Sequence, residues 1–270
     1  MAEEKDIRSE FSRRKFIGAL AGLSGATVAG SLIGLNVKSA NVKNGETLSS
    51  KKIPFYGEHQ CGITNPSPAA AIVCAFNLTT TSKQSLSDLM QILTAEIEHL
   101  MAGNSYADND IKYPPKDNLI NGENSSADEL TITIGLGASI FDERFGLQDK
   151  KPKQLISMVH FPNDQLDEKR IDGDLVIQIC AQHNETCIRA LRILIKTTRD
   201  RLILKWLEQG FSQSNTLKEG KTSTRNLMGF KDGTSNLKIQ DNKSMNEYVW
   251  VDQNDNEPEW ATGGSYMATR

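Results

Sequence analysis

The chain has 270 residues, of which 38% are hydrophobic and 24% are charged. This composition is typical of a globular protein and excludes a chain that is disordered over its whole length. The formal net charge is −3, so no overall basic field attracts a nucleic-acid backbone, and we expect no nucleic-acid partner.

The N-terminus has the features of an export signal. Arg13 and Arg14 precede an uncharged stretch at 16–35 that glycine and serine make only weakly apolar. The arrangement resembles a Tat (twin-arginine) signal, and a retained membrane anchor is the alternative. We therefore expect a signal segment at 1–40, a polar linker at 41–52, the Tat translocase as a partner, and a location in the periplasm, at the cell surface or outside the cell.

The next three segments predict the first half of a folded domain. A run of small and apolar residues at 69–78 predicts a buried strand. Apolar residues then recur at steps of three and four, which predicts a helix that begins at Ser85 and ends at Gly103. The segment 103–129 is rich in Asn, Asp, Ser and Pro, so we expect a long surface loop that is either disordered or part of a substrate rim.

The following segments predict the second half of that domain. Residues 130–136 and 175–181 have the pattern of two strands. Asn184 is suited to cap a helix, and an apolar stripe that includes Leu202 and Trp206 predicts that this helix reaches Gly210. A short last strand then follows at 211–212. The order βαββαβ predicts an α+β, ferredoxin-like unit.

The C-terminal part predicts the beginning of a second unit. Residues 248–251 and 265–268 have the pattern of two strands joined by a polar loop. The chain ends at Arg270, inside the second of these expected strands. Because a domain seldom ends in the middle of a strand, we expect the second unit to be truncated at its C-terminus.

The four cysteines are expected to be buried, unpaired thiols. Cys74 and Cys180 lie within apolar, strand-like runs, where cysteine behaves as a small hydrophobic residue. Neither these two nor Cys61 and Cys187 have the C-x-x-C spacing of metal ligands.

One segment, RNLMGFKDGTSN at 225–236, places two glycines around a single carboxylate. Gly229 and Gly233 reach backbone angles closed to other residues, so they let the loop fold tightly and bring Asp232 against a large ligand. Asp232 is the polar group of this segment that is suited to move a proton. An ordinary Asp-Gly turn is the alternative.

This segment resembles the distal-heme motif of dye-decolorizing (DyP-type) peroxidases, in the exported branch that contains the deferrochelatase/peroxidases. The blocks PFYGEHQ at 54–60, GLGASIFDERFGL at 135–147 and GDLVIQICA at 173–181 are similar to that branch in the same order. The resemblance extends from about residue 53 to residue 270. Several blocks in register are far more specific than any one of them.

The resemblance implies an enzyme that binds heme b and reduces hydrogen peroxide while it oxidises an organic reductant by one electron, with a role in iron or heme use. It also implies the DyP-type dimeric α+β barrel fold, a first domain at 53–214, the start of a heme-binding domain at 215–270, and a homo-oligomer at full length. Asp232 would move a proton between the two peroxide oxygens. Gly229, Gly233, Thr234 and Ser235 would contact the heme.

The same resemblance places a proximal histidine and a distal arginine beyond Arg270. None of the four histidines of the chain, His59, His99, His160 and His183, stands in the family's axial position. Two alternatives to a peroxidase therefore stay open. One is a deferrochelatase that removes iron from heme and leaves the porphyrin intact, and the other is a truncated fragment without activity.

Overall fold

A computed structural model describes residues 51–66, 68–107, 112–122, 126–212, 225–231 and 235–269. The chain divides into two compact units, at 1–45 and 46–270, and all of the described residues belong to the second. The expected signal segment and most of the expected linker lie outside the described residues. Among the described residues, no helix combines the length and the apolar character that a bilayer crossing requires.

Four antiparallel strands form one sheet: β1 (Ala70–Leu78), β2 (Thr131–Leu136), β3 (Leu175–Ala181) and β4 (Leu202–Phe211). Their order across the sheet is β2-β3-β1-β4, so β1 pairs with both β3 and β4. The register places Ile72 opposite Ile179 on one side and Gln209 on the other. Along the chain the elements follow one another as β1, α2, β2, β3, α3 and β4, which confirms the expected βαββαβ unit.

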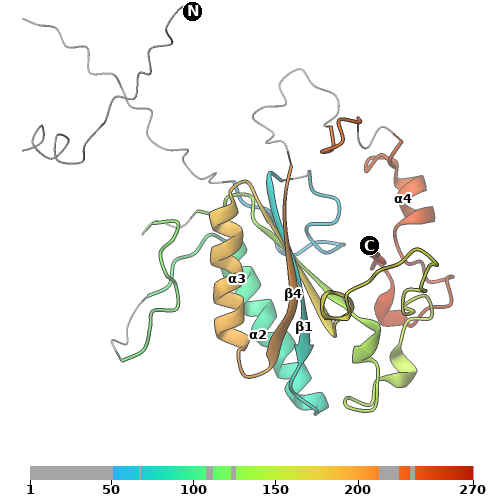
Figure 1. The fold of residues 1–270 in the computed structure, drawn as a ribbon, viewed down its shortest axis with the longest axis horizontal. Coiled ribbons are helices and arrows are strands. Elements are labelled where there is room, and N and C mark those ends of the chain that lie inside the picture. The colour runs from blue at the N-terminus through green and yellow to red at the C-terminus, as the bar shows by residue number, and fades with distance from the viewer. Residues whose placement is uncertain are drawn as a thin grey trace, which may run out of the picture. The chain divides into compact units, whose positions relative to one another are not determined.

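Two helices, α2 (Lys83–Met101) and α3 (Asn184–Thr198), cover one face of this sheet (Figure 1). Ser82 caps α2 because its side chain accepts a hydrogen bond of 3.1 Å from the Ser85 amide. Leu89 and Leu93 on α2 are buried in one hydrophobic cluster with Ile72 and Ile177 of the sheet. This burial of apolar side chains is the main force that holds the helices on the sheet.

The structure corrects the expected length of the second helix. α3 ends at Thr198, and residues 202–211, which were expected to continue it, form strand β4. Leu202 and Leu204 pair with Leu78 and Phe76 of β1. The spacing of the apolar residues fits a helix, but pairing with β1 along the length of β4 satisfies the backbone groups on one edge of that strand and outweighs the local pattern.

The C-terminal segment also differs from expectation. Residues around 248 belong to a short helix, α4 (Asn242–Tyr248), and residues 265–268 form no strand. Asp241 caps α4, because its carboxylate accepts hydrogen bonds from the Ser244 amide (3.3 Å) and hydroxyl (2.7 Å). The two strands expected at 248–251 and 265–268 are therefore not formed.

The long segment 103–129 packs against the helices in its described parts. The buried side chain of Arg189 on α3 forms an ion pair with buried Asp117, with a distance of 2.7 Å between Nη2 and Oδ2. Lys116 binds Glu96 on α2 at 2.5 Å, and Lys196 on α3 donates to the Pro114 carbonyl at 2.6 Å. These contacts correct the expectation of disorder for the described parts and place them on the helical side of the domain (Figure 1).

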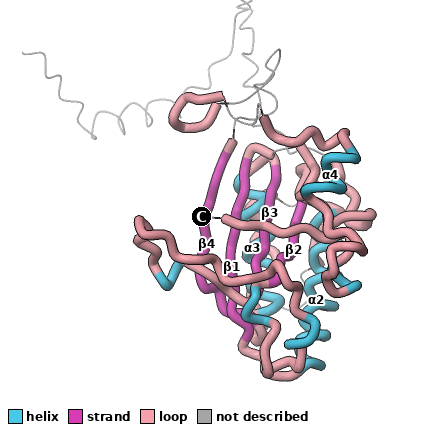
Figure 2. The backbone as a smooth tube through the Cα atoms, turned by 90° about the vertical axis from the view of Figure 1, so that its right-hand side faces the viewer, coloured by secondary structure: helices cyan, strands magenta, loops and turns pink. Residues whose placement is uncertain are grey.

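The other face of the sheet is covered, among the described residues, by loops and by the C-terminal segment. In Figure 2, which looks onto this face, α2 and α3 lie behind the strands and loops from later in the chain pass in front of them. Glu257 of the C-terminal segment accepts hydrogen bonds from the Lys153 and Gln154 amides, at 2.6 and 3.0 Å. The C-terminal segment is thereby attached to the loop that connects β2 and β3.

The outer edge of β2 is occupied by a side chain. The amide group of Gln60 accepts a hydrogen bond from the Ile134 N–H at 2.6 Å and donates one to the Ile134 carbonyl at 3.0 Å. The Thr133 hydroxyl also donates to the Cys61 carbonyl at 2.7 Å. Gln60 thus satisfies the two backbone groups of Ile134 on β2 that another strand would otherwise pair with.

Candidate functional site

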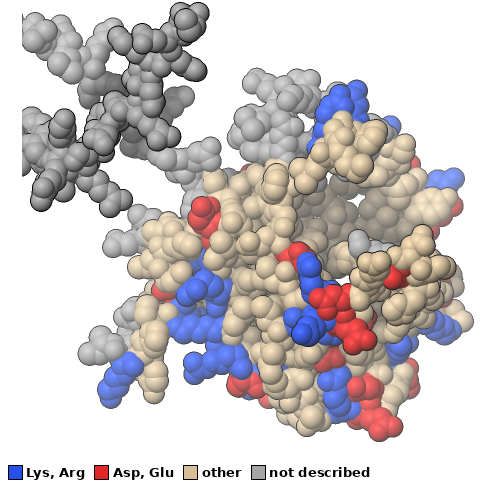
Figure 3. Space-filling view, in the orientation of Figure 1, with Lys and Arg blue, Asp and Glu red and all other residues tan. Residues whose placement is uncertain are grey.

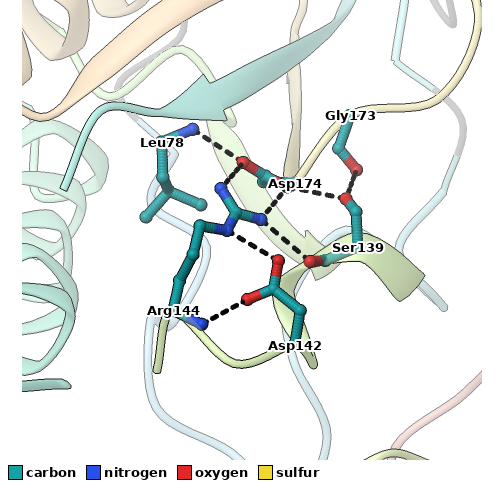
Figure 4. Close-up of polar contacts among 6 residues, drawn as sticks. All are labelled: Leu78, Ser139, Asp142, Arg144, Gly173 and Asp174. Atoms are coloured by element: carbon teal, nitrogen blue, oxygen red, sulfur yellow. Dashed lines mark hydrogen bonds and ion pairs between the residues drawn. The ribbon is translucent and has the colours of Figure 1, made fainter. Parts of the chain in front are cut away.

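A polar cluster fixes the loop after β2 to the start of β3 (Figure 4). The buried carboxylate of Asp174 accepts hydrogen bonds from Arg144 Nη1 (3.0 Å) and Nη2 (2.9 Å), from the Ser139 hydroxyl (2.6 Å) and from the Leu78 amide (2.9 Å). Arg144 Nε also binds Asp142 at 2.7 Å. The cluster joins β1, the segment 137–147 and β3 at one corner of the sheet.

The charges of this cluster stabilise one another. Burial raises the pKa of Asp174, but hydrogen bonds from Arg144, Ser139 and Leu78 outweigh burial and hold this pKa below its ordinary value. The hydrogen bond to Asp174 likewise raises the pKa of Arg144. Both groups are therefore charged at neutral pH. The cluster has the properties of a structural ion pair, and we place no reacting group in it.

The first part of the glycine-aspartate motif forms a tight turn. Arg225 and Lys231 form a β-bridge, and the Asn226 amide donates to the Phe230 carbonyl at 3.0 Å. The Asn226 side chain closes the turn, because its Oδ1 accepts hydrogen bonds of 3.1 Å from the amides of Met228 and Phe230. The side chain of Asn226, the second residue of the motif, therefore folds back over its own turn.

Gly229 has the conformation expected of it. Its φ is +87°, which a residue with a side chain rarely adopts, while an added Cβ would find no atom within 4 Å. The backbone angle therefore requires glycine here, and crowding does not. The space beside Gly229 is open, so another molecule can approach the backbone closely at this position.

The turn exposes its apolar side chains to solvent. The exposed fractions are 91% for Leu227, 81% for Met228 and 65% for Phe230. A cluster of large apolar side chains at the tip of a short turn is typical of a surface that contacts an apolar partner or ligand. In this respect the turn fits one face of a large apolar ring system.

The expected site residues are positioned only in part. Gly229 lies in the turn, and Ser235 is exposed at the start of the segment that follows it. Asp232, Gly233 and Thr234 lie outside the described residues. Their expected roles, and those of Gly229 and Ser235 in heme binding, stay predictions.

Three of the four histidines are engaged within the domain. His59 Nδ1 lies 2.8 Å from the Gly263 carbonyl, and its ring stacks on Trp250 with centroids 3.6 Å apart. His99 Nε2 lies 3.2 Å from the Ser105 carbonyl, and His183 Nδ1 lies 2.8 Å from buried Asp128. His160 is exposed. Across the described ranges, no group of three or more His, Cys, Asp or Glu side chains is arranged to hold a metal ion.

The cysteines are buried and unpaired, as their apolar context predicts. Burial raises the pKa of the Cys74 and Cys187 thiols to about 12, so both are protonated and unreactive at neutral pH.

The residues that sequence reasoning missed are the polar ones that hold loops in place. Arg144 and Asp174 both lie in blocks that resemble the DyP-type peroxidases, and Arg189 lies in the helix that begins at Asn184. A charged residue directly before an apolar strand, as Asp174 is before β3, was the available signal. Its partner, Arg144, is 30 positions away and could not be identified from spacing.

Comparison with known proteins defines the class of this protein. Residues 60–212 match the family model of the N-terminal part of Dyp-type peroxidases, and residues 223–270 match the model of the C-terminal part. The chain therefore belongs to the Dyp-type peroxidase family. The expected fold class is confirmed, and the family is one of enzymes.

The relatives within this family include deferrochelatases. The chain is 41% identical over 263 residues to the deferrochelatase of Yersinia pestis, which covers 96% of the chain and 61% of the relative. It is 40% identical over 272 residues to the deferrochelatase of Escherichia coli K12, which covers 99% of the chain and 64% of the relative. The chain thus spans less than two thirds of the length of these curated relatives.

Solved structures of DyP-type peroxidases share the fold. The enzyme from Cellulomonas bogoriensis is 32% identical, with a TM-score of 0.68 over 79% of this chain and 56% of the other. Ferric DtpA from Streptomyces lividans is 29% identical, with a TM-score of 0.71 over 80% of this chain and 55% of the other.

Proposed function

We propose that this protein acts as a heme-dependent peroxidase, which reduces hydrogen peroxide and oxidises an organic substrate by one electron. The observation that carries the proposal is the match of both parts of the chain, in order, to the two family models of Dyp-type peroxidases. The exposed apolar turn at 225–231 adds support, because it directly precedes Asp232.

Heme b is the cofactor that this proposal requires. Leu227, Met228 and Phe230 would contact one face of the macrocycle, and Gly229 would allow close approach of the backbone. Gly233, Thr234 and Ser235 would contact its edge. Heme, when bound, supplies the iron at which peroxide is activated.

Asp232 is the proposed proton carrier. Its carboxylate would accept a proton from one peroxide oxygen and return it to the other, so that the second oxygen leaves as water. None of His59, His99, His160 and His183 stands in the axial position that the resemblance implies, so we assign the axial role to none of them.

A deferrochelatase is the second candidate. It is favoured by the names of the relatives that are 40–41% identical to the chain. In that reaction heme is the substrate, iron is released and the porphyrin stays intact, which would serve iron or heme utilisation. An inactive fragment is the third candidate, because the match covers only 61–64% of those relatives.

Heme titration of the purified chain tests the proposal. A peroxidase gives a stoichiometric complex with a Soret band and peroxide-dependent oxidation of a dye, whereas a deferrochelatase accumulates fluorescent, metal-free porphyrin from supplied heme. If the chain is an inactive fragment, neither signal exceeds that of free heme. The same assays on the Escherichia coli relative provide the positive control.

A further inference from the structure

The segment 112–122 runs along α3 in the opposite direction to the helix (Figure 1). Three side-chain contacts, in order along the segment, join the two: Pro114 with Lys196, Asp117 with Arg189, and Asn121 with Thr186. The segment and the helix therefore form one continuous surface. We call the exposed side chains of residues 112–122 and 186–199 the α3 face.

The α3 face has an excess of positive charge. Five of its residues are cations with exposed or half-buried side chains: Lys112, Lys116, Arg192, Lys196 and Arg199. The three cations on the helix are spaced by four and three positions, which places them on one side of it. Residues 112–122 and 186–199 contain a single acidic residue, Asp117, and it is buried in its ion pair with Arg189. In Figure 3 blue side chains accordingly gather over α3, and few red ones lie among them.

This local charge is opposite in sign to the charge of the whole chain, which is −3. An extended anionic surface would therefore attract the α3 face and repel the rest of the molecule, so that the domain would approach in one orientation. The cations are spread over two turns of α3 and along the neighbouring segment. They fit an extended array of anions better than they fit one small anion.

Large apolar side chains lie among these cations. The exposed fractions are 71% for Tyr113, 49% for Leu119 and 42% for Ile120. All three belong to the segment that is fastened to α3. Cations combined with exposed aromatic and aliphatic side chains are typical of surfaces that lie on membranes, because the apolar groups enter the headgroup region while the cations attract anionic lipids.

We propose that the α3 face docks on the surface of a bilayer that contains anionic phospholipids. Its Lys and Arg side chains would lie beside the lipid phosphates, and Tyr113, Leu119 and Ile120 would enter the headgroup region. The opposite face of the sheet, with the C-terminal segment, would then be turned away from the bilayer (Figure 1). The proposal does not depend on the proposed peroxidase function.

Binding of the full chain to vesicles of phosphatidylcholine mixed with phosphatidylglycerol, without heme, tests the proposal. Two double variants with the same change in net charge are compared with the unchanged chain. Arg192→Glu/Arg199→Glu alters the α3 face, and Lys238→Glu/Lys243→Glu alters exposed lysines of the C-terminal part. The segment 1–45 is the same in all three chains, so any lipid affinity of its own does not distinguish them.

We expect Arg192→Glu/Arg199→Glu to weaken vesicle binding at least about tenfold and the control variant to weaken it less than about twofold, because only the first removes cations that face the lipid. The difference should shrink as salt is added, since salt screens exposed charges. Equal effects of the two variants would overturn the proposal. If Arg192→Glu/Arg199→Glu does not fold, as judged by circular dichroism, Arg192→Gln/Arg199→Gln should still weaken binding at least about fivefold.

A tryptophan placed in the apolar part of the face shows whether this part enters the bilayer. Tyr113→Trp is matched by Tyr248→Trp, since Tyr248 is 68% exposed but lies on α4. In vesicles with brominated acyl chains, which quench tryptophan inside the bilayer, we expect the fluorescence added by Tyr113→Trp to be quenched and that added by Tyr248→Trp to persist. Equal quenching of the two, or none at position 113, would contradict docking through this face. Tight binding of polyglutamate without quenching at position 113 would instead assign the face to an acidic protein and overturn the proposal.

Discussion

At the scale of single residues, the side chains of the motif at 225–236 have different roles. Asn226 and Gly229 shape the turn, and Leu227, Met228 and Phe230 present an apolar surface. None of these five groups can transfer a proton. We therefore propose Asp232, the one carboxylate of the motif, as the group that moves the proton.

Replacing Asp232 by asparagine tests that assignment. In a heme-loaded form of the protein, we expect peroxide-dependent oxidation to slow by about 10²–10⁴-fold, the usual contribution of a general acid–base group. Heme binding should persist, because asparagine has nearly the same size. Stopped-flow absorbance after mixing with peroxide measures the rate. Asp149→Asn, at an exposed aspartate, is the control, and an unchanged rate in Asp232→Asn would remove this residue from the mechanism.

Asp174 gives the domain a pH-dependent stability. The pKa of the Asp174 carboxyl is lower in the folded protein than in the unfolded chain, where it is about 3.9. The ionised carboxylate therefore adds fully to the free energy of unfolding above the unfolded pKa, and this gain is lost as the pH falls through the lower folded pKa. We expect Asp174→Asn to reduce the free energy of unfolding at pH 7 by about 1.5–3 kcal/mol, the usual range for a hydrogen bond to a charged group, because Arg144 is partly exposed and keeps Asp142 as a partner. Urea unfolding at a series of pH values should show this difference shrinking in acid. A difference that is constant with pH would contradict the assigned role.

At the scale of elements, the segment 112–122 is fastened to α3 through one buried ion pair. Arg189 is 2% exposed and Asp117 is 4% exposed, so each would be a buried, unpaired charge without the other. This buried pair acts together with the Lys116–Glu96 and Lys196–Pro114 contacts to hold the long loop on the helices.

A double-mutant cycle measures the contribution of the buried pair. We expect Arg189→Met to cost about 3–5 kcal/mol of unfolding free energy, because it leaves Asp117 unpaired. The double variant with Asp117→Leu should recover part of that loss, since it removes the unpaired charge. Thermal unfolding and limited proteolysis within 103–129 are the measurements. Additive losses in the double variant would show that the two residues do not stabilise each other.

The elements also show how far the sequence could be interpreted. The regular apolar spacing from Leu86 to Met101 identified α2 within two residues at its start, and β3 was predicted at its observed bounds. The prediction was wrong at 202–210, where the apolar spacing is compatible with a helix as well as with a strand. Leu202 and Trp206 fit an apolar stripe on a helix, yet both lie in strand β4. Only pairing with β1 decides this, and β1 lies more than 120 residues earlier in the chain.

The site was harder to predict than the fold. The turn at Gly229 follows from its composition, since a positive φ favours glycine. The Arg144–Asp174 and Arg189–Asp117 pairs could not be predicted from local sequence, because they join residues that are 30 and 72 positions apart. The attachment of the C-terminal segment to the domain also depends on tertiary contacts of Glu257, Trp260 and His59, for which local sequence has no signal.

At the scale of the whole molecule, we propose that the chain is exported through the Tat pathway and acts outside the cytoplasm. The proposal is supported by Arg13 and Arg14 ahead of a weakly apolar stretch. Assembly into a homo-oligomer at full length, and the domain limits 53–214 and 215–270, also stay predictions.

Replacing Arg13 and Arg14 together by lysine tests the export route. The charge is retained, so a requirement for charge alone would leave export unchanged, whereas a Tat signal requires the arginine pair. We expect the protein to accumulate in the cytoplasm, as measured by cell fractionation and immunoblotting. The matched change Lys5→Arg should have no effect. Normal amounts of the Arg13→Lys/Arg14→Lys variant outside the cytoplasm would exclude the Tat assignment.

The side chain of Gln60 has a consequence for how copies of this domain can associate. It occupies both backbone groups of Ile134 on the outer edge of β2, whereas β4 pairs with β1 alone among the described strands. A sheet with two open edges can add neighbours without limit and grow into a fibre. With the β2 edge closed, two domains that join through β4 leave no second open edge at either end. Edge-to-edge growth would then stop at a pair.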